Sequence, residues 1–473
     1  MSIGVRFAPS PTGYLHVGGL RTALYNYLYA KGEGGKIVLR IEDTDQSRKV
    51  EDAVEQLMSA FDVMGIHFDE GPKNKGNCGP YFQSQRLDLY KKHVSELVDK
   101  ELAYPCFCSS ERLNALRKEK QALNLSTKYD RHCLSLTKDE IADKCNSEPH
   151  VIRLKIPDSK SITFNDTVRN DVTFNTEEID DQVLLKSDGF PTYHLANVVD
   201  DYHMGITHVI RGEEWLPSTP KHILLYNAFG WEAPQFAHVP LLLNPDKSKL
   251  SKRQGDVAVE DYLKKGILPE ALINFVALLG WNPGDDREIF SMNELISEFS
   301  LERIHISGAV FNQEKLSWMN SQYLKELPLN RVVAYAKPFI TLDVNTEDDK
   351  FNRTIDFARS RVSYLTEFDE KIKYFYTHDV HEHPDANILS KTSSQSLFKF
   401  WVDELSKKNT WTPETLKALI SKTNDELGIK GKDLFFPMRL AIYGECKGPD
   451  IPSIYNILGR DEIIARFNSV IKG

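Results

Sequence analysis

The N-terminal residues alternate between apolar and polar positions in the pattern of a strand, a tight loop, a helix and a second strand. Residues 3–8 predict the first strand, two prolines and Gly13 break it, and apolar residues return at helical spacing from Leu20 to Leu28. Residues 37–41 form an apolar run that ends in acidic residues and predicts the second strand. This spacing predicts a βαβ unit with parallel strands, which binds ligands at the carboxyl ends of its strands.

The remaining pattern divides the chain into several regions. Helical spacing continues at residues 50–64 and 85–102, and a charged, helix-prone segment follows up to residue 150. Short alternating strands with turn residues then predict antiparallel structure. The first pattern of strands and helices resumes at residues 191–243, and helical spacing dominates from residue 257 onward.

Length and composition place the chain among globular proteins of several domains. Its 473 residues exceed what one hydrophobic core organises, and 41% of them are hydrophobic. We expect a cytoplasmic protein without membrane contact, because no signal pattern and no bilayer-spanning apolar run is present in the sequence. The six scattered cysteines indicate reduced thiols. The net charge is -9, and the whole excess of acidic residues lies before Lys325. The part from Lys325 onward is neutral, which permits contact with a phosphate backbone.

The loop before the first predicted helix carries the first candidate site. Gly18 and Gly19 allow close approach of the backbone, the helix start offers unpaired N–H groups to an anion, and His16 adds a side-chain donor. A glycine pair alone opens many helices for structural reasons. The longer string is more specific: YLHVGG resembles the HIGH signature of class I aminoacyl-tRNA synthetases, and RFAPSPTG before it resembles the opening of the glutamyl-tRNA and glutaminyl-tRNA synthetases.

A lysine-rich loop carries the second motif. Lys249 and Lys252 lie in KLSKR, after the strand predicted at residues 239–243, and KLSKR resembles the KMSKS loop of the same class. A lone charged loop is usually only solvated, but here both motifs occur in the order of the family. The resemblance implies that ATP binds with Mg²⁺ and that His16, Lys249 and Lys252 are catalytic. The implied ATP-binding residues are His16, Gly18, Gly19, Lys249, Leu250, Ser251, Lys252 and Arg253.

The strings RIEDTD and PTYHLANVVDD extend the resemblance to glutamyl-tRNA synthetases over the first two-thirds of the chain. The helical spacing after that resembles the bacterial type, since the related enzymes of other types carry β-barrels there. The implied fold class is an α/β Rossmann-type catalytic domain with an inserted α+β acceptor-binding domain, followed by all-α C-terminal domains. The implied domains are two catalytic halves at 1–103 and 183–255, the acceptor-stem-binding insertion at 104–182, a helical stem-contact domain at 256–325 and a helical anticodon-binding domain at 326–473.

The implied reaction is the ATP-dependent ligation of L-glutamate to the 3' end of tRNA(Glu) through a glutamyl-adenylate, with release of AMP and pyrophosphate. The substrate carboxylate is ionised at neutral pH, so no protein nucleophile is needed. Arg6 and Arg211 suit the two carboxylates of glutamate and Glu42 suits its ammonium group, while the sequence leaves open which arginine meets which carboxylate. The implied glutamate-binding residues are Arg6, Ala8, Ser10, Glu42, Tyr193, Asn197, Arg211 and Trp215.

The sequence also allows a tRNA-modifying glutamyl transferase, a non-catalytic tRNA-binding relative, and an enzyme that also charges tRNA(Gln). The first would leave the C-terminal helices without a role, and the second would not need two phosphate-binding loops. Arg361 aligns with an arginine that, in the family, reads the third anticodon base, which is C for glutamate and G for glutamine. Its donors suit the acceptors of cytosine, so we expect an enzyme that rejects tRNA(Gln). The alternative is that Arg361 is solvated or binds a phosphate. We also expect a monomer.

The sequence disfavours zinc. Some glutamyl-tRNA synthetases bind zinc in a similar insertion through Cys-x-Cys and Cys-x-His, and Cys106, Cys108 and Cys133 match three of these ligands. Ser135 stands at the place of the histidine, and a hydroxyl is a poor substitute where structural zinc takes four N or S donors. His132 or Cys145 could replace it, but we expect buried thiols without metal.

Overall fold

The computed structural model describes residues 2–11, 13–45, 50, 52–250 and 258–471. The chain divides into two compact units. The N-terminal unit comprises Met1–Tyr262 and Leu272–Gln313, and the C-terminal unit comprises Leu263–Ala271 and Glu314–Gly473.

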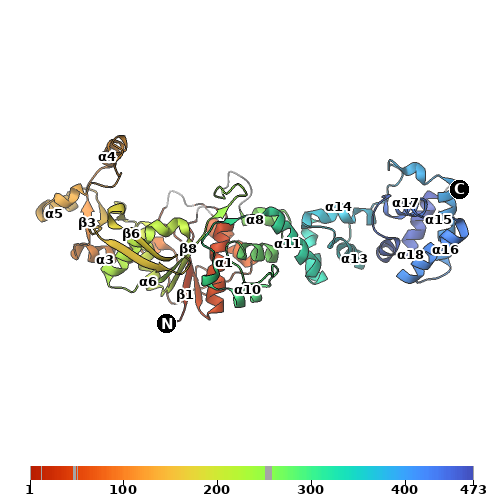
Figure 1. Ribbon diagram of the computed structural model, residues 1–473, viewed down its shortest axis with the longest axis horizontal. Helices are drawn as coiled ribbons and strands as arrows, with labels where there is room; N and C mark the ends of the chain where they lie inside the picture. The colour runs from red at the N-terminus through yellow and green to blue at the C-terminus, as the bar shows by residue number, and fades with distance from the viewer. Residues whose placement is uncertain (1, 12, 46–49, 51, 251–257, 472–473) are drawn as a thin grey trace. The chain divides into compact units, whose positions relative to one another are not determined.

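Parallel strands form the centre of the N-terminal unit (Figure 1). β1 pairs with β2 and β8 pairs with β9, both in parallel, and the amide of Thr207 donates to the carbonyl of Gly4 at 2.8 Å, which places β8 beside β1. The predicted strand, helix and strand at the N-terminus are therefore confirmed. The strands are β1 Gly4–Phe7, β2 Lys36–Leu39, β3 Ala103–Cys106, β4 Val151–Leu154, β5 Ser161–Asp166, β6 Asn170–Asn175, β7 Val183–Leu185, β8 His208–Gly212, β9 Gln235–Val239, β10 Leu242–Leu243 and β11 Ala309–Val310.

The region predicted as antiparallel contributes to two sheets. β3, β4 and β7 form an antiparallel sheet, and β5 and β6 form an antiparallel hairpin. The hairpin also joins the parallel sheet, because Asp166 of β5 pairs with Phe236 of β9. The β5–β6 hairpin thus belongs to the same sheet as β8, and β7 lies beyond residue 182. The predicted domain boundaries cut through these sheets and stay a prediction.

One predicted strand is divided in the structure. The pattern predicts a strand at residues 239–243, whereas β9 ends at Val239 and β10 begins at Leu242. Pro240 lies between them and has no backbone N–H to donate to a sheet, which explains the break.

Helices cover the sheets and supply the core of the N-terminal unit. Leu97 of α3, Leu195 of α6 and Leu225 of α7 are fully buried in one hydrophobic cluster with Ile152 of β4 and Val209 of β8. Figure 1 shows α4 and α5 beyond β3, at the end of this unit. The helices up to residue 298 are α1 Val17–Gly32, α2 Ala53–Val63, α3 Leu87–Asp99, α4 Ser110–Ala122, α5 Lys138–Ser147, α6 Tyr193–His203, α7 Thr219–Phe229, α8 Val259–Lys264, α9 Pro269–Ala277 and α10 Met292–Glu298.

The described residues of the C-terminal unit form helices and no strand. Trp401 of α15 lies in its core and donates to the hydroxyl of Thr423 of α16 at 2.9 Å, which joins the two helices. The predicted fold class, including the helical C-terminal part, is confirmed. None of the described helices is long and apolar enough to cross a bilayer. The later helices are α11 Gln313–Glu326, α12 Leu329–Ala336, α13 Asp349–Ala358, α14 Phe368–Ile372, α15 Thr392–Ser406, α16 Pro413–Leu427, α17 Lys432–Tyr443 and α18 Ile451–Val470.

Candidate active site

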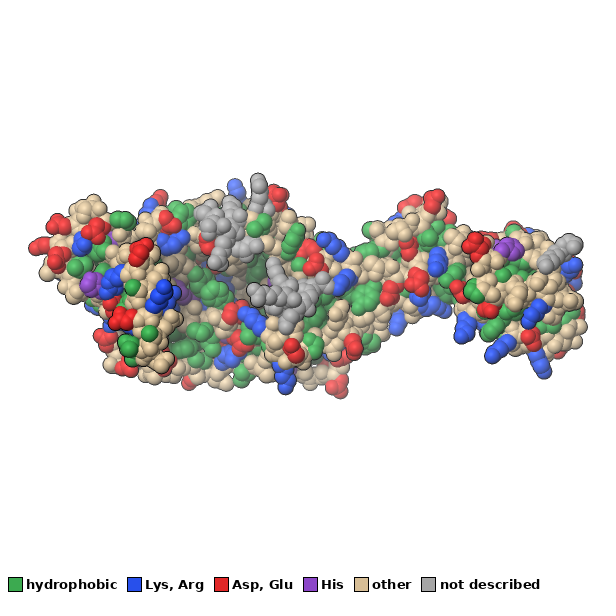
Figure 2. Space-filling model, turned by 90° about the horizontal axis from the view of Figure 1, so that it is seen from above, with side chains coloured by type: hydrophobic (Ala, Val, Ile, Leu, Met, Phe, Trp, Pro, Cys, Tyr) green, Lys and Arg blue, Asp and Glu red, His purple; other side chains and the backbone are tan. Residues whose placement is uncertain are grey.

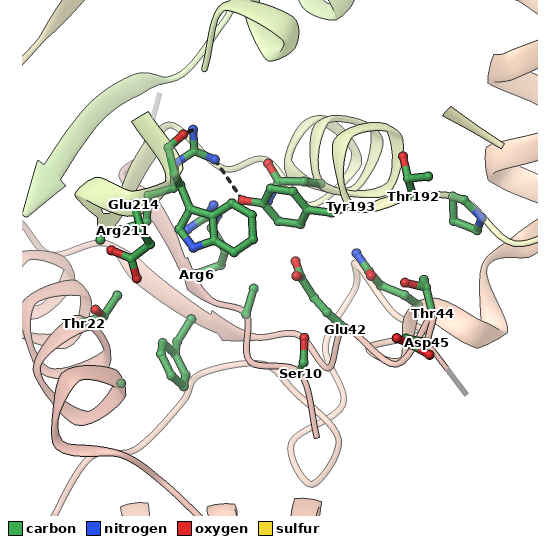
Figure 3. A pocket seen from close by; sticks show the side chains of 18 of the residues that line it. Arg6, Ser10, Thr22, Glu42, Thr44, Asp45, Thr192, Tyr193, Arg211 and Glu214 are labelled. Carbon is green, nitrogen blue, oxygen red and sulfur yellow. Dashed lines mark hydrogen bonds between the residues drawn. The ribbon is translucent and has the colours of Figure 1, made fainter. Parts of the chain in front are cut away.

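A cavity of about 710 Å³ opens at the carboxyl ends of β1, β2 and β8. Figure 3 shows that its side chains come from β1 and β8, from the segment after β2, from α1 and from the start of α6. Parallel sheets commonly bind ligands at this edge. The structure brings every residue predicted to bind glutamate to this cavity, together with Gly18 and Gly19: Arg6, Ala8, Ser10, Glu42, Tyr193, Asn197, Arg211 and Trp215.

Arg6 lies on β1, and the protein itself compensates its charge. Its Nε donates to the two oxygens of Asp201 at 3.1 and 3.2 Å, and Asp201 also accepts from Arg40 at 2.7 Å. All three side chains are almost completely buried. Burial raises the pKa of Asp201, but Arg6 and Arg40 outweigh burial and hold that pKa below its ordinary value. Because Asp201 lies on α6, a buried ion pair ties this helix to β1.

Glu42 follows β2 and presents a carboxylate to the cavity. It accepts from Arg40 at 3.2 Å, and its side chain is 10% exposed. Burial raises the pKa of Glu42 above its ordinary value, although Arg40 and Arg6 act in the opposite direction. A cation on the cavity side would favour the ionised form, so the site suits an ammonium group.

Arg211 lies on β8, next to β1, and is held in a different way. Its guanidinium donates to the hydroxyl of Tyr193 at 2.9 Å, to the hydroxyl of Thr219 at 2.9 Å and to Nε2 of His238 at 3.0 Å. The two hydroxyls are neutral, and the imidazole of His238 is neutral when its Nε2 accepts. None of the described carboxylates forms an ion pair with Arg211. The hydrogen bond to Tyr193 is visible in Figure 3. Arg211 therefore combines a fixed position with a charge that the described residues do not compensate directly.

Tyr193 and Trp215 form one wall of the cavity beside Arg211. Their ring centroids lie 4.2 Å apart with a tilt of 37°. Asn197 lies one turn further along α6, and in the orientation that satisfies its amide it donates to Asp201 at 3.2 Å and accepts from Arg40 at 3.3 Å. Neutral polar groups thus lie beside the two arginines, in addition to the carboxylate of Asp201 that pairs with Arg6.

The start of α1 differs in one respect from the prediction. Nδ1 of His16 accepts from the amide of Gly18 at 2.9 Å, so His16 caps the helix and this N–H group is not open to an anion. A ring nitrogen that accepts carries no proton, and the proton of the neutral ring is then on Nε2. The donor predicted for His16 is consequently its Nε2.

The lysine-rich loop is described only at its two ends. Lys249 pairs with Leu243 of β10, and Leu250 is held to β10 by a backbone hydrogen bond. At the other end Ala258 pairs with His16. The chain therefore returns beside the start of α1, as two loops serving one substrate would require. The predicted residues Ser251, Lys252 and Arg253 lie outside the described residues.

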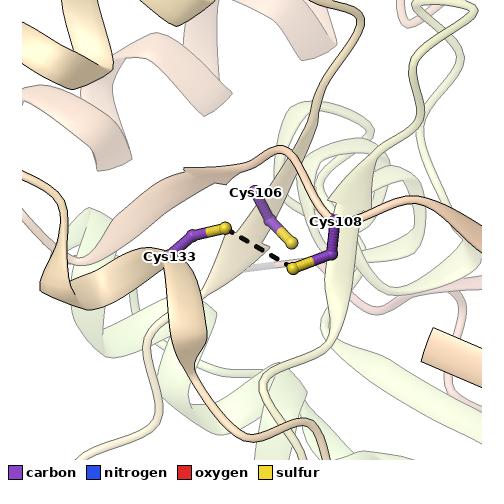
Figure 4. Close-up of side chains that lie close together, drawn as sticks. All are labelled: Cys106, Cys108 and Cys133. Carbon is purple, nitrogen blue, oxygen red and sulfur yellow. Dashed lines mark hydrogen bonds between the residues drawn. The ribbon is translucent and has the colours of Figure 1, made fainter. Parts of the chain in front are cut away.

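The three predicted cysteines lie together, as Figure 4 shows. The sulfur atoms of Cys106, Cys108 and Cys133 are all within 4.8 Å of one another. The hydroxyl of Tyr129 lies 3.4 Å from the Cys106 sulfur and 3.3 Å from the Cys108 sulfur, and it accepts from the amide of Cys133 at 3.1 Å. Tetrahedral zinc with thiolate ligands places neighbouring donors about 3.8 Å apart, so three thiols and one phenol fit such an ion.

The other proposed zinc ligands are not in this group. Among the described residues, Cys145 and His132 are absent from the cluster, and Ser135 donates to the carbonyl of His132 at 2.8 Å. Tyr129 was not predicted from the sequence as a member of this cluster. It lies four residues before Cys133, so spacing alone offered a weak signal.

Arg361 lies in the C-terminal unit, just after α13. Its guanidinium carbon stands 3.8 Å above the ring of Phe357, and it donates to the Ser360 hydroxyl at 3.1 Å. The side chain is exposed. A guanidinium stacked on an aromatic ring is fixed in orientation, which suits base recognition better than a freely solvated side chain does.

Several residues that shape the cavity were not predicted from the sequence. Asp201 had a readable signal, because Tyr193, Asn197 and Asp201 recur every four residues and so share one face of α6. His238 and Asp166 lie on separate strands and had no such signal. Their proximity depends on the β5–β6 hairpin joining the parallel sheet.

Comparison with known proteins gives the class and then the family. The model of the class I tRNA synthetase catalytic domain (E and Q) matches residues 2–318, and that of an anticodon binding domain matches residues 331–471. The chain therefore belongs to the class I tRNA synthetases of the E and Q group.

Full-length relatives narrow the family. A glutamate–tRNA ligase of Clostridioides difficile (strain 630) is 46% identical over 98% of this chain and 98% of its own length, and one of Chlorobaculum parvum is 48% identical over 98% and 96%. A crystal structure of a glutamate tRNA ligase from Elizabethkingia meningosepticum, in complex with its amino acid, has a TM-score of 0.91 at 38% identity, covering 100% of this chain and 99% of that one. The chain belongs to the glutamate–tRNA ligase family.

Proposed function

We propose that the protein joins L-glutamate to the 3' end of tRNA(Glu), using ATP with Mg²⁺ and passing through a glutamyl-adenylate. The observation that supports this most is the cavity, whose lining also includes Asp45, Lys186 and Glu214, and in which the guanidinium groups of Arg6 and Arg211 on neighbouring strands and the carboxylate of Glu42 face the same space. Glutamate carries two carboxylates and one ammonium group, so its charges complement this set. Tyr193, Ser10 and Asn197 add neutral hydrogen-bonding groups to the lining.

The residues of the cavity bind and orient the reactants. Arg6 and Arg211 hold the two carboxylates of glutamate, and Glu42 holds its ammonium group. The ionised α-carboxylate then attacks the α-phosphorus of ATP, which needs no protein nucleophile. His16 offers Nε2–H at the start of α1, where phosphate oxygens gain from the helix dipole.

The lysines of the KLSKR loop stabilise the charge that grows on the phosphates in the transition state. Lys249 starts this loop beside β10, and the chain returns beside His16. The role of Lys252 stays a prediction from the sequence.

A charging assay tests the function. Purified protein, ATP, Mg²⁺ and labelled glutamate should load a tRNA pool, and the label should be absent when the terminal ribose of the tRNA has been oxidised by periodate. Loading of oxidised tRNA would instead indicate a glutamyl transferase that modifies a base. No loading of either pool would favour a non-catalytic tRNA-binding protein.

Arg361 supports a preference for tRNA(Glu) over tRNA(Gln). Its stacked and exposed guanidinium offers donors to cytosine, whereas the Watson–Crick edge of guanine presents donors that oppose it. Figure 2 shows further Lys and Arg side chains projecting along one edge of the C-terminal unit, which suits a phosphate backbone. Arg361→Gln should relax rejection of tRNA(Gln) and leave tRNA(Glu) charging largely intact. Efficient charging of tRNA(Gln) by the wild type would contradict this, and equal losses on both tRNAs would assign Arg361 to the backbone.

The cysteine cluster supports a structural zinc ion, although the sequence disfavours one. The sequence disfavours zinc because Ser135 is a poor fourth ligand; the phenol of Tyr129 ionises far more readily than the alcohol of a serine, and its oxygen lies 3.4 and 3.3 Å from two of the three sulfur atoms. Cys106, Cys108 and Cys133 would supply thiolates that fix β3 to the segment before α5.

Metal analysis tests the zinc proposal. We expect about one zinc per chain, lost in Cys133→Ser and weakened in Tyr129→Phe. Cys145→Ser is the matched control, because Cys145 is exposed in the same region and stands outside the cluster. Protein purified without chelators that contains no zinc would restore the expectation of free thiols.

A further inference from the structure

A buried chain of hydrogen bonds reaches the cavity from the β5–β6 hairpin: Asp166 contacts His238, and His238 contacts Arg211. We propose that Asp166 and His238 are positioning residues, which orient Arg211 toward a carboxylate of the substrate while leaving its positive charge available. This inference rests on the proposed function, because it takes Arg211 as a contact of glutamate.

Asp166 is a fixed acceptor at the base of this chain. It accepts from the amides of Val168 and Arg169 at 3.1 and 3.0 Å and from the amide of His238 at 3.2 Å. Its side chain is fully buried. A carboxylate with several N–H donors is held in one orientation and stays ionised.

The contacts of His238 define where its proton lies. Nδ1 is 2.5 Å from an oxygen of Asp166, and Nε2 is 3.0 Å from Nε of Arg211. Arginine has no acceptor, so its Nε–H must donate and the Nε2 of His238 must accept. The ring proton is therefore on Nδ1 and is donated to Asp166. Burial lowers the pKa of His238 to about 4; the hydrogen bond to Asp166 opposes this shift and Arg211 adds to it, and the result agrees with a neutral ring.

The consequence concerns the charge of Arg211. A carboxylate in direct contact with its guanidinium would compete with the carboxylate of a ligand. Here a neutral imidazole stands between Arg211 and Asp166, so Asp166 compensates the buried charge at a distance while the guanidinium keeps a fixed plane. The other described acceptors of Arg211 are also uncharged: the hydroxyls of Tyr193 and Thr219, the carbonyl of Trp215, and Nδ1 of His222, whose pKa burial lowers well below its ordinary value. This arrangement orients the donor fork without neutralising it.

The chain of hydrogen bonds also links the β5–β6 hairpin to the strands that carry Arg211 and His238. Asp166 is the last residue of β5, His238 lies on β9 and Arg211 lies on β8. The register that pairs Asp166 with Phe236 brings the carboxylate to His238, two residues further along β9. The β5–β6 hairpin thereby supports the glutamate-binding edge of the sheet.

The first test reads the proton of His238 directly and needs no substrate. The imidazole ¹⁵N resonances of histidine-labelled wild-type protein, with His238 assigned by its loss in His238→Gln, should show a neutral ring protonated on Nδ1 at neutral pH. They should remain in that form well below the ordinary pKa of histidine, about 6.5. An Nε2-protonated ring or an imidazolium at neutral pH would overturn the proposal.

The second test compares KM values for the two small substrates. His238→Leu removes the acceptor of Arg211 and should raise KM for glutamate about tenfold or more, with KM for ATP and kcat changed less than about threefold. Asp166→Asn keeps the shape and should act in the same direction with a smaller effect. His238→Gln can still accept from Arg211 and should restore part of the loss.

His208→Gln is the matched control. His208 is a buried histidine on β8 that contacts Tyr29 and Thr207 rather than Arg211, so KM for glutamate should not change. Equal rises of both KM values in His238→Leu, or a rise in the control as large as in His238→Leu, would overturn the proposal. If His238→Leu does not fold, the proposal is tested by the imidazole ¹⁵N resonances of the wild type and by KM for glutamate in Asp166→Asn.

The two tests separate this inference from the proposed function. A wild type that does not charge tRNA with glutamate removes the function, whatever the state of His238. A wild type that charges normally but carries its His238 proton on Nε2 leaves the function in place and removes the positioning role.

Discussion

Arg6 and Arg211 enter the same cavity from neighbouring strands, yet the protein holds their guanidinium groups by different means. Arg6 is paired directly with the buried carboxylate of Asp201, which it shares with Arg40. Arg211 donates hydrogen bonds to Tyr193, Thr219 and His238, and the imidazole of His238 separates it from Asp166. Arg6 therefore also takes part in the ion pairing that joins β1 to α6, whereas none of the described carboxylates pairs directly with Arg211.

This difference indicates how the effects of substitutions should separate. Removing one partner of a buried ion pair leaves an uncompensated charge in the interior, and that cost appears in folding. Changing an arginine that is held by neutral groups costs less in folding and more in binding. Substitutions around Arg6 should thus mainly lower the free energy of unfolding, and substitutions around Arg211 should mainly lower the affinity for the substrate.

The largest expected effect is on the Arg6 side. Asp201→Asn leaves Arg6 and Arg40 without their shared carboxylate and should lower the free energy of unfolding of the N-terminal unit by about 3–5 kcal/mol. Urea unfolding of both proteins measures this. Asp158→Asn is the control, because that side chain is 83% exposed and pairs with Arg131 at the surface. A loss no larger than in the control would show that Asp201 does not carry the pairing.

Arg211→Lys should separate binding from folding. Lysine keeps the charge but cannot donate in a planar fork, so kcat/KM for glutamate should fall roughly 100-fold while the free energy of unfolding changes less than in Asp201→Asn. Steady-state charging of tRNA(Glu) with varied glutamate gives the first quantity, and urea unfolding gives the second. A variant that loses stability but retains its affinity for glutamate would reverse the assignment of the two arginines.

Glu42 offers a comparison through pH. Its pKa is raised, so protonation should remove the ammonium contact at a higher pH than an exposed glutamate would allow. KM for glutamate should rise, about tenfold in all, as the pH falls from about 8 to about 5, where the substrate carboxylates are still ionised. In Glu42→Gln the KM should be high throughout and nearly flat with pH. A parallel pH dependence in wild type and variant would contradict the ammonium contact.

The smallest expected effect tests the neutral support of Arg211. Thr219→Val removes a hydroxyl that accepts from Arg211 at 2.9 Å and nearly preserves the shape of the side chain. The loss of one neutral hydrogen bond, about 1 kcal/mol, should raise KM for glutamate about fivefold. Equal KM values for wild type and variant would show that Tyr193 and His238 suffice to hold the guanidinium.

The sequence predicts the residues that line the cavity more fully than it predicts the buried residues that hold them in place. Arg6 and Arg211 lie one residue before the end of a recognisable strand, and Glu42 lies shortly after one. Parallel strands present these ends at one edge of a sheet. Asp201 could have been found from its helical spacing with Tyr193 and Asn197.

The contact of Asp166 with His238 could not have been found in that way. It depends on a hairpin that pairs with β9 through one residue pair, which no local periodicity encodes. The cap made by His16 was missed because histidine is not a usual N-cap residue. The break at Pro240 follows directly from its missing N–H and shows that a proline inside an apolar run should divide a predicted strand.

Selectivity between glutamate and glutamine is the most direct test of a cavity that recognises two carboxylates. The two amino acids have nearly the same shape, and only glutamate brings a second negative charge to Arg6 and Arg211. Charging of purified tRNA(Glu) by the wild type should favour glutamate over glutamine by a factor on the order of 10³ or more in kcat/KM, because the amide leaves a guanidinium without its counter-charge. Charging with glutamine within tenfold of glutamate would contradict a cavity that recognises two carboxylates.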